Sequence, residues 1–439
     1  MSRRNSNRQL VPLTWCLAGL LLVAACGGRG SDADTGGVKN DSGVKVAQVV
    51  KKDDCTGYQA SPGISDDEIK LGSSYPDSGP LASIGETNKG MESYFKHLNE
   101  SGGINGRKIT LIGKDDQYDP TKASANVNEL LQKDRVFAIV GVQSTTGTMA
   151  VWDQLARECV PILESTISSA TRDQRAAHRN AIDGLVPYAS EGYALAGYLT
   201  KTLGEKKVAV ITQDGSFGDA AARGVERAIE ENGGKLVAHE SFQVTDPTVR
   251  SQVTTLKASG ADALVVIAAG TKCPQIFDTV AASGWKPTIA TTFTCSNTTL
   301  MGLAKPASTD GIISDGWVRV RTADDPESKT FLDAVKKYAP GVNASSENVA
   351  IGWAQGQIVA AILERATELT RVGVINSALG LDGVAVPMAV DGVKASTSAD
   401  DSAPIESVQI RTFDSAAGAW TPVTTDALVD MTGKLGDFE

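Results

Sequence analysis

The chain has few of the residues from which metal sites and acid–base catalytic sites are usually built. It contains three histidines in 439 residues, and its six cysteines include no Cys-x-x-Cys pair, so no metal site is expected. The hydrolase and phosphate-loop signatures Gly-x-Ser-x-Gly, His-Glu-x-x-His and Gly-Lys-Ser/Thr are missing as well. Ser93 and Lys96 match the Ser-x-x-Lys pattern of penicillin-recognising enzymes, but the companion Lys-Thr-Gly is absent. The sequence therefore predicts no catalytic residue and no cofactor.

Positive charge and long apolar runs are also scarce. Lys and Arg number 42 against 52 Asp and Glu, which gives a formal net charge of -10. Because nucleic-acid affinity comes mainly from basic residues that neutralise phosphates, no nucleic-acid partner is expected. Beyond residue 25, apolar runs such as 261–269 have only the length of a strand. Aromatic residues make up 5% of the chain, whereas glycine occurs 44 times, which is typical of α/β proteins with many tight connections.

The N-terminal segment carries the three parts of a secretory signal. Three arginines among the first eight residues precede an apolar run, from about residue 11 to 25, that ends in small residues. The run is shorter than the roughly 20 apolar residues that a bilayer-spanning helix needs. The tetrapeptide Val-Ala-Ala-Cys that ends at Cys26 resembles the bacterial lipobox. We therefore expect a signal peptide over 1–25 and an extracytoplasmic chain anchored to the cell membrane by lipid at Cys26. An ordinary signal peptide with an incidental cysteine is the alternative.

Four cysteines remain for disulfide bonds after Cys16 is removed and Cys26 is lipidated. An even number of cysteines outside the cytoplasm favours disulfides, and four cysteines allow three pairings. Cys273 and Cys295 follow adjacent strand-like runs, so the predicted pairs are Cys273–Cys295 and Cys55–Cys159. Free buried thiols are the alternative.

Apolar runs and amphipathic stretches alternate along the chain from residue 64, behind a polar, Gly- and Asp-rich tether over 26–63. The predicted strands cover 69–72, 108–114, 136–140, 161–163, 207–212, 235–241, 263–267, 288–292 and 405–414, and the predicted helices 87–99, 121–132, 147–159, 191–203, 218–232, 248–259, 274–283, 328–338 and 349–370. This alternation predicts an α/β protein with two doubly wound parallel-sheet domains, divided near residues 183–187. Ligands of such sheets bind beyond the carboxyl ends of the strands, so the cleft between the domains is the expected site.

Six short motifs stand in order along this pattern. They are Ile69-Lys70-Leu71-Gly72, Gly79-Pro80-Leu81-Ala82, Asn99-Glu100-Ser101-Gly102-Gly103-Ile104-Asn105-Gly106-Arg107, Val140-Gly141-Val142-Gln143-Ser144-Thr145-Thr146-Gly147, Asp214-Gly215-Ser216-Phe217-Gly218 and Gly352-Trp353-Ala354-Gln355. Together they resemble type I periplasmic binding proteins of the branched-chain amino acid class, the solute receptors of ABC importers. The resemblance covers roughly residues 64–430.

The resemblance implies an organisation and a function for the chain. An N-terminal lobe over 64–187 and 317–382 and a C-terminal lobe over 188–316 and 383–439 would be joined by a hinge of several crossovers. The chain would capture a small polar solute between the lobes and deliver it to an ABC transporter permease. A ligand sensor for a membrane receptor with the same fold, and an extracytoplasmic hydrolase, are the alternatives.

The resemblance also points to the residues that would contact the solute. The loop that starts at Ser144 lies between a strand and a helix, where hydroxyls and backbone N–H groups favour a carboxylate. The pattern alone also fits a plain N-cap, and Phe217 alone also fits a core aromatic. The predicted ligand-binding residues are Ser144, Thr145, Ser165 and Thr166 in the first lobe and Phe217, Thr271 and Thr294 in the second.

One loop departs from the family pattern. Amino acid receptors of this family commonly present an acid to the ligand ammonium in the loop that covers residues 292–297 here, yet these residues include no Asp or Glu. Burying an ammonium without an acidic partner is costly. A carboxylate, an amide or another neutral polar compound therefore competes with an amino acid as the expected ligand. Asp77, Glu164 or Asp214 could replace the missing acid if they reached the cleft.

Two further groups of residues are interpreted as structural. Asp115, Asp116 and Asp119 do not have the spacing of an EF-hand loop, so we expect an acidic turn in contact with solvent rather than a calcium site. Trp317 and Trp353 are expected to pack in the interior rather than to contact the ligand.

Overall fold

A computed structural model describes residues 38–39, 45–46, 48–319, 325–424 and 428–438. The predicted signal peptide and Cys26 lie outside the described residues. Contacts along the chain group residues 36–439 into one compact unit, to which the description is confined. No helix in the described ranges is long and apolar enough to cross a membrane.

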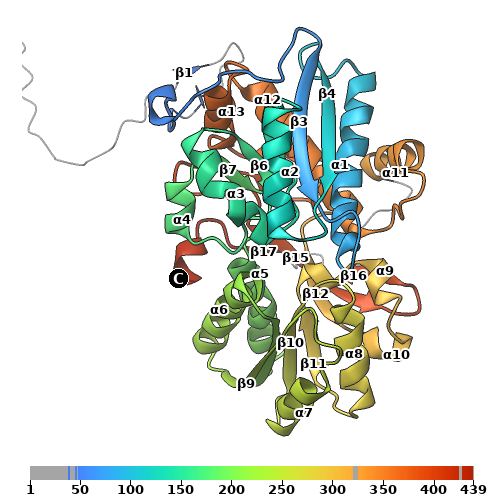
Figure 1. The fold of residues 1–439 in the computed structure, drawn as a ribbon. Helices are drawn as coiled ribbons and strands as arrows, with labels where there is room; N and C mark the ends of the chain where they lie inside the picture. Colours follow the sequence, from blue (N-terminus) through green and yellow to red (C-terminus); the bar gives the residue numbers. More distant parts are fainter. Residues whose placement is uncertain (1–37, 40–44, 47, 320–324, 425–427, 439) are drawn as a thin grey trace, which may run out of the picture. The chain divides into compact units, whose positions relative to one another are not determined.

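The first lobe is built on a parallel sheet in the order β4-β3-β5-β6-β7 (Figure 1). Its strands are β3 (Glu68–Tyr75), β4 (Lys108–Asp115), β5 (Ala138–Val140), β6 (Ile162–Ser165) and β7 (Ala181–Asp183), and its helices are α1 (Ala82–Glu100), α2 (Pro120–Gln132), α3 (Thr145–Arg157), α4 (Arg172–Ala177), α11 (Pro326–Tyr338), α12 (Glu347–Arg365) and α13 (Arg371–Ala378). Apolar residues of α2 and α3 cluster with Ile139 and Ile162 on one face, whereas α1 and α12 share a cluster with Leu71 and Val140. Burial on both faces explains why the central strand β5 is apolar throughout, whereas the edge strand β4 contains charged and exposed residues.

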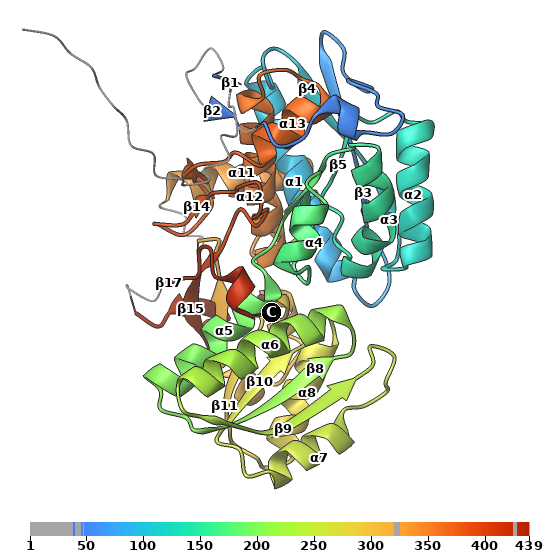
Figure 2. The same ribbon diagram turned by 90° about the vertical axis from the view of Figure 1, so that its left-hand side faces the viewer.

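The second lobe contains a mixed sheet in the order β16-β15-β12-β11-β10-β8-β9, with β17 beside β15 (Figures 1 and 2). Its strands are β8 (Lys207–Gln213), β9 (Lys235–Phe242), β10 (Ala263–Ile267), β11 (Thr288–Thr291), β12 (Ile313–Gly316), β15 (Ser407–Asp414), β16 (Ala419–Pro422) and β17 (Leu428–Asp430), and its helices are α5 (Tyr188–Gly197), α6 (Ser216–Glu231), α7 (Arg250–Ala258), α8 (Lys272–Ala282), α9 (Thr298–Met301) and α10 (Pro306–Thr309). β8 to β12 are parallel, and β15, β16 and β17 add an antiparallel edge. The predicted doubly wound α/β arrangement is confirmed, with this antiparallel edge as an addition.

Short elements complete the described fold. They are the pairs β1 (Val38–Lys39) with β2 (Lys45–Val46) and β13 (Val384–Ala385) with β14 (Lys394–Ala395), the 3-10 turns η1 (Lys52–Asp54), η3 (Phe293–Cys295) and η4 (Leu435–Phe438), and the π-helical turn η2 (Tyr198–Thr202). The predicted helix over 191–203 is therefore α5 followed by η2.

The residues around β14 bear on the lobe boundary. Ser402 bonds to Asp183 and Arg175 of the first lobe, and Ser396 to Pro404. These contacts favour a last crossing near Pro404 rather than at residue 382, and we propose that boundary.

The motif at Gly352 reflects close contact between two helices. A Cβ atom at Gly352 would lie 1.7 Å from the backbone oxygen of Thr87, so only glycine lets α12 approach α1 this closely. The neighbouring Trp353 is buried and donates its indole N–H to Glu327 at 2.7 Å. Trp317 is also buried, so both tryptophans pack in the interior, as predicted.

Both predicted disulfides are present. Cys55 and Cys159 have Cα atoms 5.5 Å apart, and Cys273 and Cys295 have Cα atoms 5.4 Å apart. The first bond ties the segment before β3 to the end of α3, and the second ties the start of α8 to η3.

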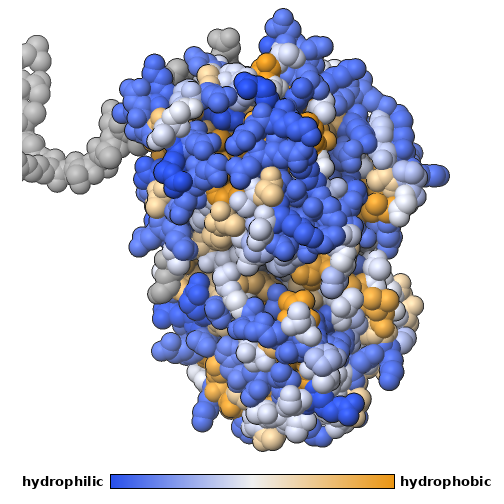
Figure 3. Space-filling model, viewed as in Figure 1, coloured by the Kyte–Doolittle hydropathy of each residue, from blue (hydrophilic) through white to orange (hydrophobic). Residues whose placement is uncertain are grey.

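The face shown in Figure 3 is mostly hydrophilic. The large apolar side chains exposed among the described residues are single and separate, Leu203, Leu303 and Leu428.

Candidate functional site

A pocket lies where the carboxyl ends of strands from both sheets come together. It is lined by Ile84, Thr87, Tyr118, Gln143, Thr145, Thr166, Leu185, Tyr188, Phe217, Ala269, Phe293, Thr294, Asn348 and Ile351. Ile84 and Thr87 of α1 and residues after β4, β5, β6 and β7 form one side, residues after β8, β10 and β11 form the other, and the first turns of α12 contribute Asn348 and Ile351. The cavity has a volume of about 40 Å³. This is the expected position of a binding site in open parallel sheets.

The N-terminus of α3 places one hydroxyl in the pocket and uses another to cap the helix. Ser144 is the N-cap residue, and its Oγ accepts a hydrogen bond from the backbone N–H of Gly147 at 3.0 Å. Thr145 lines the pocket and is 3% exposed, and its hydroxyl lies beside the phenols of Tyr118 and Tyr188. A helix N-terminus adds free N–H groups and the positive end of the helix dipole. Together these groups suit a carboxylate or another hydrogen-bonding group.

Tyr118 enters the pocket from a turn with unusual backbone geometry. Gln117 and Tyr118 both adopt the left-handed conformation, with φ of 54° and 63°. Asp116 holds the turn: its buried carboxylate accepts hydrogen bonds from the Tyr118 N–H and the Ser74 hydroxyl, both at 2.8 Å. Burial raises the pKa of Asp116. Strained non-glycine residues of this kind are concentrated at functional sites.

The acidic turn that was expected to be solvated is therefore partly interior. Asp115 is exposed, and Asp119 caps α2, but Asp116 is fully buried. No group of acidic, histidine or cysteine residues in the described part of the chain is arranged to hold a metal ion. The turn positions Tyr118, which the sequence pattern did not predict as a site residue.

Aromatic side chains form the apolar part of the wall. The rings of Tyr188 and Phe217 meet edge to face with centroids 4.6 Å apart, so Phe217 both lines the pocket and packs on α5. Burial raises the pKa of the Tyr188 phenol well above its ordinary value, which keeps it a neutral donor. The phenols of Tyr118 and Tyr188 both lie near the Thr145 hydroxyl. One end of the pocket is thus polar and hydroxyl-rich, and the rest is largely apolar.

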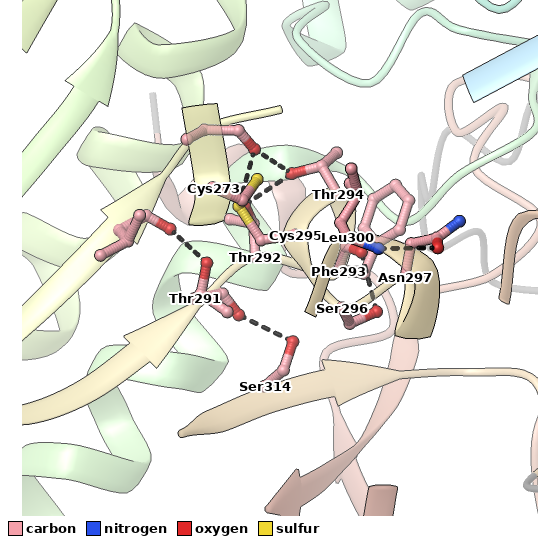
Figure 4. The surroundings of a disulfide bond; sticks show 12 residues. Cys273, Thr291, Thr292, Phe293, Thr294, Cys295, Ser296, Asn297, Leu300 and Ser314 are labelled. Carbon is pink, nitrogen blue, oxygen red and sulfur yellow. Dashed lines mark hydrogen bonds between the residues drawn. A yellow bond between two sulfur atoms is a disulfide. The ribbon is translucent and has the colours of Figure 1, made fainter. Parts of the chain in front are cut away.

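The loop from Phe293 to Asn297 is held in place by several contacts (Figure 4). The Thr294 hydroxyl donates to the backbone oxygen of Ala268 at 2.6 Å, and the next residue forms the Cys273–Cys295 disulfide. The Phe293 N–H donates to the buried Glu191 carboxylate at 2.5 Å. Burial raises the pKa of Glu191 well above its ordinary value, and Asp315 beside it has a pKa raised to about 6. The two carboxyl groups are therefore expected to share a proton at neutral pH.

Four of the seven predicted ligand-binding residues line this pocket and three do not. Thr145, Thr166, Phe217 and Thr294 are in the lining. Ser144 caps α3, Thr271 is exposed, and the Ser165 hydroxyl accepts the backbone N–H of Val142 at 3.1 Å. The sequence analysis did not predict Tyr118 or Tyr188 as site residues. The signal that could have found them is their position: Tyr118 lies just beyond a predicted strand, and Tyr188 lies just beyond the predicted domain boundary. Phe293, which directly precedes the predicted Thr294, was not predicted either.

None of the described residues that line the pocket has a charged side chain. None of the three acids that could have replaced the missing carboxylate takes part in the lining. Asp77 pairs with Lys89 at 3.0 Å, and Asp214 bonds to Gln243. Glu164 is fully buried, has a positive φ, and neither carboxylate oxygen has a partner in the described ranges. Burial raises its pKa well above the ordinary value.

Comparison with known proteins places this geometry in a wider group. The sequence pattern of a family described as periplasmic binding protein matches residues 68–418. Leu/Ile/Val-binding protein homolog 3 of Brucella melitensis is 29% identical over 196 residues, which are 44% of this chain and 53% of that protein. The chain thus spans about half the length of this curated relative.

Solved structures share the fold at low sequence identity. A branched-chain amino acid ABC transporter protein from Thermus thermophilus with bound valine has a TM-score of 0.74 and 17% identity, covering 84% of this chain and 98% of that one. A solute-binding protein of an ABC transporter from R. palustris in complex with benzoate has a TM-score of 0.71 and 19% identity, covering 83% and 98%. The expected type I periplasmic binding protein fold is confirmed by these likenesses.

Proposed function

Because the chain belongs to the family of periplasmic binding proteins, we propose that it is an extracytoplasmic receptor for a small organic solute. The observation that carries the proposal is the pocket between the carboxyl ends of the two sheets, lined from both lobes by uncharged polar and aromatic side chains. Closing two lobes on a solute removes water and strengthens each hydrogen bond to it. The receptor would deliver the solute to an ABC transporter permease, and no catalytic step is assigned to it.

The pocket favours a solute with a carboxylate or amide and without an ammonium group. The Thr145 hydroxyl and the N-terminus of α3 are donors, and no carboxylate among the described residues lines the pocket to balance a cation. Valine and benzoate, the molecules bound in the two similar structures, share a carboxylate, whereas only valine carries an ammonium. The aromatic wall of Tyr188, Phe217 and Phe293 suits an apolar body.

A thermal-shift panel tests both the function and the solute class. L-leucine and L-valine are compared with 4-methylvalerate, isovalerate and their amides, and with benzoate. We expect an acid or amide without an amine to raise the melting temperature, since a hundredfold excess over Kd adds about 2.7 kcal/mol to stability. If only the amino acids do so, the missing acid is compensated elsewhere. If no compound raises the melting temperature and native mass spectrometry of the purified chain finds no small molecule, the receptor function is contradicted.

A matched pair of variants tests the role of the polar end. Thr145→Val keeps the shape of a buried side chain and removes its hydroxyl, whereas Thr146→Val makes the same change at an exposed neighbour outside the lining. For the compound that shifts the wild-type melting temperature most, Thr145→Val should weaken binding about ten- to a hundredfold. Equal affinities of the two variants in calorimetry would place the polar contact elsewhere.

We also propose that the receptor is tethered to the membrane through lipid on Cys26. The proposal rests on the basic, apolar and small-residue parts of the first 25 residues and on the cysteine that follows them. Cys26→Ala should release the protein to the medium or leave an uncleaved precursor. Membrane fractionation and the mass of the N-terminal peptide are the measurements, and unchanged values for both would contradict lipidation.

A further inference from the structure

Asn297 links the two lobes beside the pocket. It lies on the loop that supplies Phe293 and Thr294, and it is 1% exposed. Its side-chain oxygen caps α9 by accepting the N–H groups of Thr299 and Leu300. Its Nδ2 donates across to the first lobe, to the Ser346 hydroxyl at 2.7 Å and to the Glu86 carboxylate at 3.4 Å. The oxygen of this side-chain amide thus caps a helix, and its nitrogen links the two lobes.

The Ser346 side chain makes this contact between lobes instead of capping its own helix. Ser346 is the N-cap residue of α12, where a serine side chain normally accepts a backbone N–H of the first turn. Here it makes no such bond. Its buried hydroxyl accepts from Asn297 and donates to Glu86 at 2.6 Å. A helix of 19 residues thus forgoes a side-chain cap in favour of a contact between lobes.

The helix and the loop joined by these bonds stand on opposite sides of the pocket. Asn348 and Ile351, in the first turns of α12, line it from one side, and Phe293 and Thr294 line it from the other. The Cys273–Cys295 disulfide ties the loop to α8, so the loop cannot move without its lobe. A second contact supports the same closure: a Cβ at Gly270 would lie 2.7 Å from the Leu81 side chain of the first lobe.

We propose that Asn297, Ser346 and Glu86 form a latch between the lobes, and that Asn297 is a positioning residue for the solute. The inference rests on the proposed receptor function and deepens it. Asn297 and Ser346 do not line the pocket, so the latch acts by holding the two walls against the solute. When the lobes separate, hydrogen bonds to water replace these bonds. The bonds therefore stabilise the closed state only by the difference in free energy between the two sets of hydrogen bonds. The latch therefore adjusts how long the pocket stays closed without choosing the solute.

Hydrogen–deuterium exchange of the full-length chain without added solute tests the latch. Asn297→Asp keeps the oxygen that caps α9, removes both N–H donors, and places a carboxylate beside Glu86. Asn232→Asp is the matched control, because the Asn232 amide bonds to Ala228 within α6 of the same lobe. Ser346→Ala removes the latch from the other side.

For Asn297→Asp we expect exchange on the order of tenfold faster in both joined segments, residues 293–301 and 345–352. Ser346→Ala should accelerate the same two segments, and Asn232→Asp should leave both at wild-type rates. Faster exchange confined to the mutated side, or wild-type exchange in both segments, would overturn the latch. Exchange is read without a solute, so a solute panel and a native mass spectrum that both fail would contradict the receptor function and leave this test intact. If Asn297→Asp lowers the melting temperature enough to unfold, Ser346→Ala alone decides.

Discussion

Replacing Cys55 and Cys159 together by alanine is expected to lower the free energy of unfolding by about 4.7 kcal/mol. The bond joins residues 104 positions apart, and the loop-closure entropy that it removes from the unfolded chain grows with this separation. Chemical unfolding of the non-reduced wild type and of the double variant, followed by circular dichroism, measures it.

The second disulfide provides the matched comparison. Cys273 and Cys295 are 22 positions apart, so the same relation predicts a loss of about 3 kcal/mol for their double alanine variant. A loss for Cys273 and Cys295 that equals or exceeds the loss for Cys55 and Cys159 would contradict the loop-entropy explanation. In that case, contacts made by η3 in the folded protein would account for the stability instead.

Asp183→Ala is expected to destabilise the protein by about 3–5 kcal/mol. Asp183 and Arg175 form an ion pair of 2.8 Å whose side chains are both completely buried. Asp183 also accepts the Ser168 hydroxyl at 2.8 Å and the N–H of Leu185 at 3.3 Å. Burial raises the pKa of Asp183 and Arg175 opposes that rise. The substitution leaves a guanidinium without its partner in the interior, directly before the chain crosses to α5.

Two further variants separate the charge effect from a packing effect. Arg175→Met combined with Asp183→Leu removes both charges and should recover most of the lost stability, since replacing a buried pair by apolar residues is often neutral. Glu92→Ala breaks the exposed pair with Lys96 and should cost under about 1 kcal/mol. Thermal unfolding of the four proteins would contradict the explanation if Asp183→Ala cost no more than Glu92→Ala.

The sequence by itself determined the class of fold and most of its elements. Apolar runs predicted strands such as β5 and β10, because strands buried on both faces must be apolar throughout. Amphipathic stretches predicted helices such as α2 and α6. The disulfide pairs followed from cysteine number and position. Short elements such as β7, β12 and α13 were not predicted. Three or four residues of mixed polarity carry too little periodicity to identify a strand. The sequence of α13 shows hardly more periodicity than these strands do.

Only the tertiary structure decided which polar side chains face the pocket. Ser144 and Thr145 are adjacent hydroxyls in one loop, yet the extended backbone of Ser144 directs its side chain to the helix end and leaves that of Thr145 in the pocket. Tyr118 was hidden in an acidic turn, because its place depends on two left-handed residues held by a buried carboxylate. Asn297 reads as a helix cap, and its second role depends on Ser346, 49 residues away. The direction in which a side chain points is set by contacts between distant segments, whereas the periodicity of apolar residues is a property of the local sequence.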